Sequence, residues 1–148
     1  MRAAKTGHIY AVQALLEASA DVDEPSTADA CSPLFMAVES GHIDVPSALL
    51  LRRANVDMEK LDDGVTPLNM AAFKGDIDVV EVLLLNCADV YKATTELGTT
   101  PLYVAAENGH LAVVQALLRE ASLVQISRLP SALICCWMPV ALLRRMVV

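Results

Sequence analysis

The chain has 148 residues, the length of one domain, and 55% of them are hydrophobic, which is enough for a continuous core. Its 18 acidic and 11 basic residues give a formal net charge of −7, and the imbalance is local, because residues 1–124 hold all 18 acidic residues but only 8 basic ones. The net charge of −10 in this segment argues against binding to nucleic acid or anionic membranes and favours partners with basic surfaces.

The four cysteines, Cys31, Cys87, Cys135 and Cys136, have no C-x-x-C spacing, so we expect neither a zinc site nor a disulfide framework. Thiols are typical of a reducing compartment, which favours a cytoplasmic location, with the nucleus as an alternative. Residues 1–20 contain an acidic residue and no long apolar run, so they do not form a signal peptide.

Three sequence markers recur with the same period of 34 residues, and such self-similarity is the signature of a repeat protein. Residues 1–4 enter the pattern in the middle of a helix, so the first repeat is predicted to be truncated. The markers are the glycines Gly7, Gly41, Gly75 and Gly109, the Ser/Thr-Pro-Leu steps at 32–34, 66–68 and 100–102, and the Ala-Asp/Asn-Val steps at 20–22, 54–56 and 88–90.

The clearest unit, residues 63–90, predicts two helices. Thr66 is a good helix N-cap, Pro67 suits the first helical position, and Gly75 ends the first helix. A second helix, with apolar residues at helical spacing, begins near Asp78 and is followed by a polar, protruding turn. Neither helix can bury its apolar stripe alone, so the units must stack.

This pattern resembles the ankyrin repeat signature, most clearly over residues 64–90 and again over 98–118. The resemblance covers about residues 1–124 and implies an all-α, L-shaped solenoid with β-hairpin or loop fingers and a concave face that binds proteins. It divides the chain into a partial repeat at 1–23, repeats at 24–57, 58–91 and 92–124, and a degenerate cap or non-repeat tail at 125–148.

Three features depart from the family pattern. The period is 34 rather than about 33 residues, which lengthens each finger by one residue. The family's histidine after Thr-Pro-Leu is Phe35, Asn69 or Tyr103 here, so we expect its hydrogen bonds to be lost. The glycine that closes the second helix is replaced, and a non-glycine residue in a left-handed conformation costs roughly 1 kcal/mol. The replacing residues are Ser19, Arg53, Cys87 and Ala121.

The apolar tail, residues 128–148, allows three interpretations. It folds as a degenerate capping repeat, or it contacts a membrane through acylation of Cys135-Cys136 with Arg144-Arg145 near the headgroups. In the third interpretation it is not an evolved sequence and follows from a truncated or misread gene. Its apolar span is too short and too interrupted by proline for a transmembrane helix.

The sequence contains no motif for catalysis. His8, His42 and His110 lie at equivalent repeat positions, so we expect a ladder with local backbone hydrogen bonds rather than a metal site, whose ligands must converge. Acidic pairs in the fingers and at helix ends are interpreted as solvated charge, and no phosphate-binding loop or nucleophile elbow occurs. We therefore expect no enzyme activity, no cofactor and no metal.

Protein binding has better support, because two sets of positions vary in residue type on the repeated frame. One set lies near the end of each first helix, and the other lies in the fingers. Phe73, an aromatic residue beside a lysine, is the best candidate for a contact anchor. The candidate binding residues are Lys5, Thr6, Glu39, Ser40, Phe73, Lys74, Glu107 and Asn108 in the first set, and Glu59, Asp62, Asp63 and Glu96 in the second.

We interpret the chain as a non-catalytic protein–protein interaction module, a scaffold or adaptor that acts as a monomer on an unidentified protein with a basic or mixed surface. Two alternatives stay open. The chain is a regulatory or targeting fragment of a larger enzyme or channel, which the truncated first repeat favours, or it is a membrane-associated adaptor that uses its apolar tail. The main interpretation includes neither nucleic-acid binding nor membrane contact.

Overall fold

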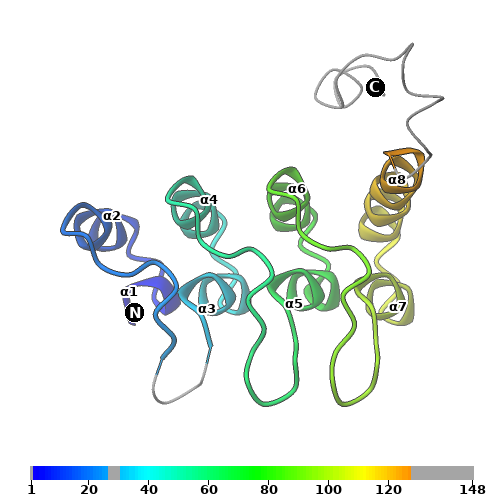
Figure 1. Ribbon diagram of the computed structural model, residues 1–148, viewed down its shortest axis with the longest axis horizontal. Coiled ribbons are helices and arrows are strands. Elements are labelled where there is room, and N and C mark those ends of the chain that lie inside the picture. Colours follow the sequence, from blue (N-terminus) through cyan, green and yellow to red (C-terminus); the bar gives the residue numbers. More distant parts are fainter. Residues whose placement is uncertain (1, 27–30, 128–148) are drawn as a thin grey trace, which may run out of the picture.

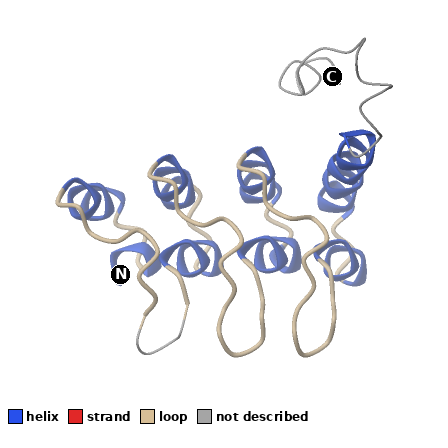
Figure 2. Ribbon diagram, viewed as in Figure 1, coloured by secondary structure: helices blue, strands red, loops and turns tan. Residues whose placement is uncertain are grey.

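The computed structural model describes residues 2–26 and 31–127, and these residues form eight α-helices in two layers (Figure 1). Loops leave the inner layer on the side opposite the outer layer (Figure 2). This arrangement confirms the all-α repeat solenoid, whereas the interpretations of residues 128–148 lie outside the described residues. The inner helices are α1 (Arg2–Lys5), α3 (Pro33–Glu39), α5 (Pro67–Lys74) and α7 (Pro101–Glu107), and the outer helices are α2 (Ile9–Glu17), α4 (Asp44–Leu51), α6 (Ile77–Leu85) and α8 (Leu111–Ser127).

The inner helices α3, α5 and α7 begin as the sequence predicts. The hydroxyl oxygens of Ser32, Thr66 and Thr100 accept hydrogen bonds from the backbone N–H groups three residues further on, at 3.1, 3.2 and 3.3 Å. A proline follows each of these residues at the start of the helix, where its missing N–H group has no helical partner to lose. Each short helix therefore starts at a residue that local chemistry defines.

Neighbouring helix pairs pack side by side and share one continuous apolar core. Ala37, Ala71 and Ala105 occupy equivalent positions of the inner helices and are 0% exposed, so the small side chains allow close approach. Leu49 and Leu83 of the outer helices are equally buried and fill the space between the layers. A buried leucine contributes roughly 1.5–3 kcal/mol, so stacking supplies the stability that these short helices lack alone.

The turn between the two helices of a repeat depends on glycine. Gly75 ends α5 with a φ of 76°, in the left-handed region. A Cβ atom added there would lie 2.5 Å from the ring of His110 in the next repeat, and Gly7 has the same relation to His42. Glycine is thus required at these positions both by backbone conformation and by packing between repeats.

The outer helices end in a left-handed residue that is not glycine. Ser19, Arg53 and Cys87 have φ values of 60°, 64° and 64°, so the strain expected from the missing glycine is present at all three. Ala121 occupies the equivalent position but lies inside α8, which continues to Ser127. The expected strained cap is therefore absent at Ala121, because the helix does not end there.

The fingers are loops, and no β-strand occurs within residues 2–26 and 31–127. Each of the two fully described fingers is closed by a backbone hydrogen bond, from the Lys60 N–H to the Val65 carbonyl at 2.9 Å and from the Thr94 N–H to the Thr99 carbonyl at 3.0 Å. One further bond joins the two fingers, from the Thr95 N–H to the carbonyl of the preceding finger at 3.0 Å. The fingers are narrow turns held in register rather than a β-ladder.

Candidate binding surface

Side-chain donors at or just after the ends of α3, α5 and α7 link successive repeats. His42 Nε2 donates to the Lys5 carbonyl at 3.1 Å, and His110 Nε2 donates to the Phe73 carbonyl at 3.0 Å. Two of the three histidines of the predicted ladder thus bond to backbone carbonyls, but the prediction that these bonds would be local was wrong, because both reach the preceding repeat. The carbonyls of Lys5 and Phe73 lie at equivalent repeat positions, so the same acceptor is used at both interfaces.

The repeat between them has an aspartate, Asp76, where the histidine would stand, and a carboxylate cannot donate to a carbonyl. Lys74 supplies the missing donor. Its Nζ atom lies 3.0 Å from the Glu39 carbonyl oxygen and 3.3 Å from that of Val38, and it is 3.7 Å from the carboxylate of Asp76. Lys74 therefore has a structural role in addition to its place among the candidate binding residues.

A second set of links, at the base of the fingers, was missed at the sequence level. Asp21, Asn55 and Asp89 each accept a hydrogen bond from the backbone N–H two residues further on, which is the geometry of an Asx-turn. The carboxylates of Asp23 and Asp57 then accept from the N–H groups of Asn55 and Asp89 in the next repeat, at 2.9 and 3.0 Å. The recurring Asp/Asn-x-Asp spacing was the signal that could have revealed them.

The predicted loss of hydrogen bonds at the family's histidine position was wrong for Asn69. Its side-chain oxygen accepts from the Thr66 hydroxyl at 2.6 Å, and its Nδ2 atom donates to the Thr99 carbonyl at 3.1 Å. Asparagine has both a donor and an acceptor, so it joins α5 to the following finger. Phe35 has no polar side-chain atom and is 1% exposed, so the prediction holds there.

Four candidate residues form what we call the inner-helix row, which consists of Lys5, Glu39, Phe73 and Glu107. They occupy one repeat position near the ends of α1, α3, α5 and α7, which pack side by side, and all four are exposed. Phe73 is 56% exposed, a large value for an aromatic side chain on a helix whose other face is core. The structure thus brings together a row in which one aromatic residue lies between two carboxylates.

The residues that follow the row shape the helix ends. Thr6 Oγ1 donates to the Arg2 carbonyl at 3.1 Å, and Asn108 Nδ2 donates to the Val104 carbonyl at 2.9 Å. Ser40 is exposed at the end of α3. The Arg2 and Val104 carbonyls also accept the backbone N–H groups of Thr6 and Asn108, both at 3.1 Å, so each of these two side chains adds a second hydrogen bond at a helix end.

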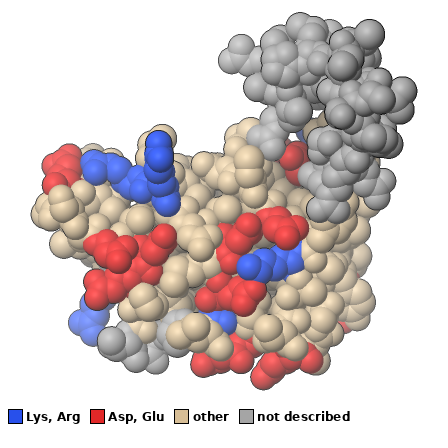
Figure 3. Space-filling model, in the orientation of Figure 1, with Lys and Arg blue, Asp and Glu red and all other residues tan. Residues whose placement is uncertain are grey.

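Ion pairs hold most of the candidate residues in the fingers. Lys60 Nζ lies 3.4 Å from Asp63 and 3.8 Å from Asp62, and Lys92 Nζ lies 3.0 Å from Glu59. The nearby Asp63 carboxylate raises the pKa of Lys60 above its ordinary value, although partial burial opposes the shift. Figure 3 shows acidic side chains gathered over the loops and fingers, with few basic ones among them.

The fingertips also expose apolar side chains. Leu61 is 74% exposed beside Asp62, and Leu97 is 81% exposed beside Glu96. The candidate finger residues lie in loops that follow the outer helices, whereas the inner-helix row lies near the ends of the inner helices, so the finger residues form a second, separate group. Both groups share the same composition, a carboxylate next to an exposed apolar side chain.

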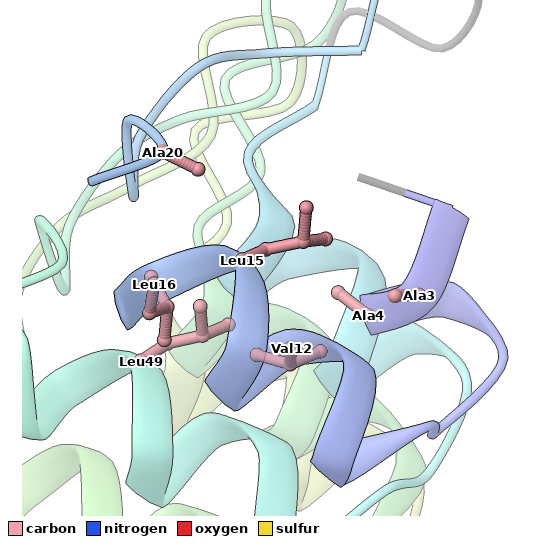
Figure 4. A pocket seen from close by; sticks show the side chains of 7 residues that line it. All are labelled: Ala3, Ala4, Val12, Leu15, Leu16, Ala20 and Leu49. Atoms are coloured by element: carbon pink, nitrogen blue, oxygen red, sulfur yellow. The ribbon is translucent and has the colours of Figure 1, made fainter. Parts of the chain in front are cut away.

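A small pocket lies at the N-terminal end of the stack, among α1, α2 and α4 (Figure 4). Its lining has no polar side chain, so it offers no group for catalysis or for orienting a ligand. Within the described residues, no three His, Cys, Asp or Glu side chains are grouped so that they could hold a metal ion. In the same part of the chain, no helix has the length and apolar character needed to cross a membrane. The pocket is lined by Ala3, Ala4, Val12, Leu15, Leu16, Ala20 and Leu49.

Comparison with known proteins identifies the family of the repeats. A family model described as ankyrin repeats in three copies matches residues 1–94 and 48–128. No curated protein matches the chain. The matched residues include every helix of the two layers.

Proposed function

The chain belongs to the ankyrin repeat family, and from this premise we propose that it is a non-catalytic protein–protein interaction module, a scaffold or adaptor. Ankyrin repeats are in general protein-binding modules. The observation that carries the proposal is the inner-helix row, where the backbone is held by a repeated set of hydrogen bonds while the exposed side chains differ from repeat to repeat. A constant frame with varied surface residues is suited to recognising one partner.

Phe73 is the proposed contact anchor. It is 56% exposed, it projects from a helix that is mostly buried, and its backbone carbonyl accepts a hydrogen bond from His110. Aromatic residues that become buried at the centre of an interface contribute a large share of binding energy, often more than about 2 kcal/mol. We propose that the module acts as a monomer in the cytoplasm or nucleus, with a basic or mixed partner surface favoured by its acidic face.

The experiment is an affinity capture of partners from cell extract by the intact chain and by two variants. Phe73→Glu places a charge in the inner-helix row, whereas Leu85→Glu places the same charge at a 65% exposed apolar position on the outer helix α6. We expect both variants to keep the helical circular dichroism spectrum. Phe73→Glu is expected to lose the captured partner, and Leu85→Glu is expected to keep it. Undiminished capture by Phe73→Glu would remove Phe73 from the binding surface.

A further inference from the structure

We propose that the inner-helix row binds a segment of a partner protein in the extended polyproline II conformation, which carries two cationic side chains about six residues apart and an apolar side chain midway between them. This inference rests on the proposed function, because it names the chemistry of the partner at the same surface. It is carried by the order of residues in the row, by their exposure and by the spacing of the helices.

Two of the three charges in the row, those of Glu39 and Glu107, suit a cationic partner, whereas the third, Lys5, lies at the end of the row on α1. Glu39 and Glu107 are exposed and lie on the two helices that flank the helix of Phe73. Among the described residues, no Lys or Arg forms an ion pair with either carboxylate. The nearest lysine in sequence to Phe73, Lys74, is directed at backbone carbonyls and at Asp76. The Lys74 ammonium group is thus engaged by groups of the stack itself and does not neutralise Glu39 or Glu107.

The apolar position lies between the two carboxylates. Phe73 is 56% exposed and belongs to α5, which packs between α3 and α7. Tyr103 on α7 is 54% exposed, and its hydroxyl lies 3.5 Å from the Glu107 carboxylate. One end of the row therefore offers an aromatic ring together with a negative charge, which suits the aliphatic stem and cationic head of a lysine or arginine.

The spacing of the helices sets the spacing of the partner's side chains. Packed helices lie roughly 8–10 Å apart, and a polyproline II segment rises about 3.1 Å per residue with about three residues per turn. One repeat therefore corresponds to about three residues, or one turn, of such a segment, so its residues i, i+3 and i+6 face the row together. In a β-strand, residue i+3 would face away from the row. A cationic residue opposite Glu39, an apolar residue opposite Phe73 and a second cationic residue opposite Glu107 give the pattern of positions i, i+3 and i+6. A helical segment would need a spacing about twice as long, because its rise is about 1.5 Å per residue.

The fingers also combine negative charge with exposed apolar side chains, which favours the same kind of partner. Their two lysines, Lys60 and Lys92, are paired with finger carboxylates, so the fingers present mainly negative charge. At the tips, exposed leucines lie beside carboxylates, as in the pairs Leu61-Asp62 and Glu96-Leu97. A negative surface of this kind attracts a basic segment at long range and raises its rate of association.

The test is selection from a displayed library of random peptides, about twelve residues long, on the intact chain at low salt. We expect enrichment of peptides with Lys or Arg at positions i and i+6 and an apolar residue at i+3. Enrichment of acidic or uncharged peptides would overturn the inference, and so would a spacing typical of a helix or the absence of any enrichment.

Variants locate the interaction on the row. For the most enriched peptide, Glu39→Gln and Glu107→Gln are each expected to weaken binding about two- to fivefold, the range for a surface ion pair. Glu81→Gln on the outer helix α6 changes the net charge equally at an exposed position and should leave binding within the experimental error. An equal loss in all three variants would show attraction by overall charge and would overturn the assignment to the row.

The outcome separates the two proposals. If Phe73→Glu abolishes capture of a partner while the selected peptides lack the cationic pattern, the module binds proteins as proposed and the inference about partner chemistry falls. If the cationic peptides bind and respond to Glu39→Gln and Glu107→Gln, the inference stands. The proposed function falls if the unmodified chain captures no partner, whereas capture of the same partner by the Phe73→Glu variant removes only Phe73 from the binding surface.

Discussion

Glycine substitution at four equivalent positions should change stability in opposite directions, depending on the backbone at each site. Ser19, Arg53 and Cys87 have φ values between 60° and 64°, and all three side chains are exposed. Ala121, at the same repeat position, lies in the helical backbone of α8. We expect glycine to raise the free energy of unfolding at the first three positions and to lower it at Ala121.

The magnitude follows from two opposing terms. A left-handed conformation costs an ordinary residue roughly 1–2 kcal/mol, which glycine avoids. Glycine also makes the unfolded chain more flexible, which lowers the free energy of unfolding by roughly 0.4–1 kcal/mol. The net gain is about 0.5–1 kcal/mol per site, and about 1.5–3 kcal/mol for the triple variant if separate repeats contribute additively. In the middle of a helix, by contrast, Ala121→Gly loses about 1 kcal/mol.

Thermal unfolding followed by circular dichroism measures the effect. For a chain of this length, 1 kcal/mol corresponds to a Tm change of roughly 2–4 °C, so the triple variant should unfold roughly 3–12 °C higher and Ala121→Gly roughly 2–4 °C lower. The sign difference at one repeat position is the informative result. If all four single substitutions shifted Tm in the same direction, the reasoning from backbone conformation would be refuted.

Three further changes test the frame that supports the binding surface. Gly75→Ala should lower the free energy of unfolding more than Gly109→Ala. Both glycines have a positive φ, but only at Gly75 would a Cβ atom meet a neighbouring ring, that of His110. Thermal unfolding of the two variants measures the difference. Asn69→Ala should lose about 2 kcal/mol in urea unfolding, because it removes the bond to the finger carbonyl and the side-chain acceptor of the buried Thr66 hydroxyl proton. A loss below about 0.5 kcal/mol would contradict this role. Asp63 raises the pKa of Lys60 above the ordinary 10.5, so their attraction stabilises the fold below that pH and is lost as pH rises through the folded-state pKa. The free energy of unfolding in urea should therefore fall between about pH 8 and about pH 11, by at most about 1 kcal/mol from this pair, because the pair is in contact with solvent. Lys60→Met should remove this part of the fall.

Much of the fold could be predicted from the sequence, because the repeat markers have local physical roles. Thr66 caps a helix wherever a proline and an apolar run follow it, and Gly75 ends one because few other residues adopt a positive φ. The 34-residue period then requires stacking, since no single helix pair can bury its apolar face. The order and type of the helices follow from these features alone.

The candidate site was predictable in position but not in contacts. The row of Glu39, Phe73 and Glu107 follows from the period, and their exposure agrees with the expectation of a surface set. That Lys74 replaces a histidine as the donor between repeats could not be read from the sequence. It depends on how far a long side chain on one helix reaches toward the carbonyl of its neighbour. Binding by these residues stays a prediction.

The residues at the repeat position where the family has a helix-ending glycine show what the local sequence does not determine. The sequence by itself shows a non-glycine residue at Ser19, Arg53, Cys87 and Ala121, and it determines the period, the helix starts and the stacking. Only the tertiary structure decides that three of these residues take the left-handed conformation and the fourth does not. In the first three repeats the chain must reverse into a finger whose base is tied to a neighbouring repeat, and packing of the stack holds the strained residue in place. After Leu117 no such finger follows within the described residues, so helical hydrogen bonds continue through Ala121.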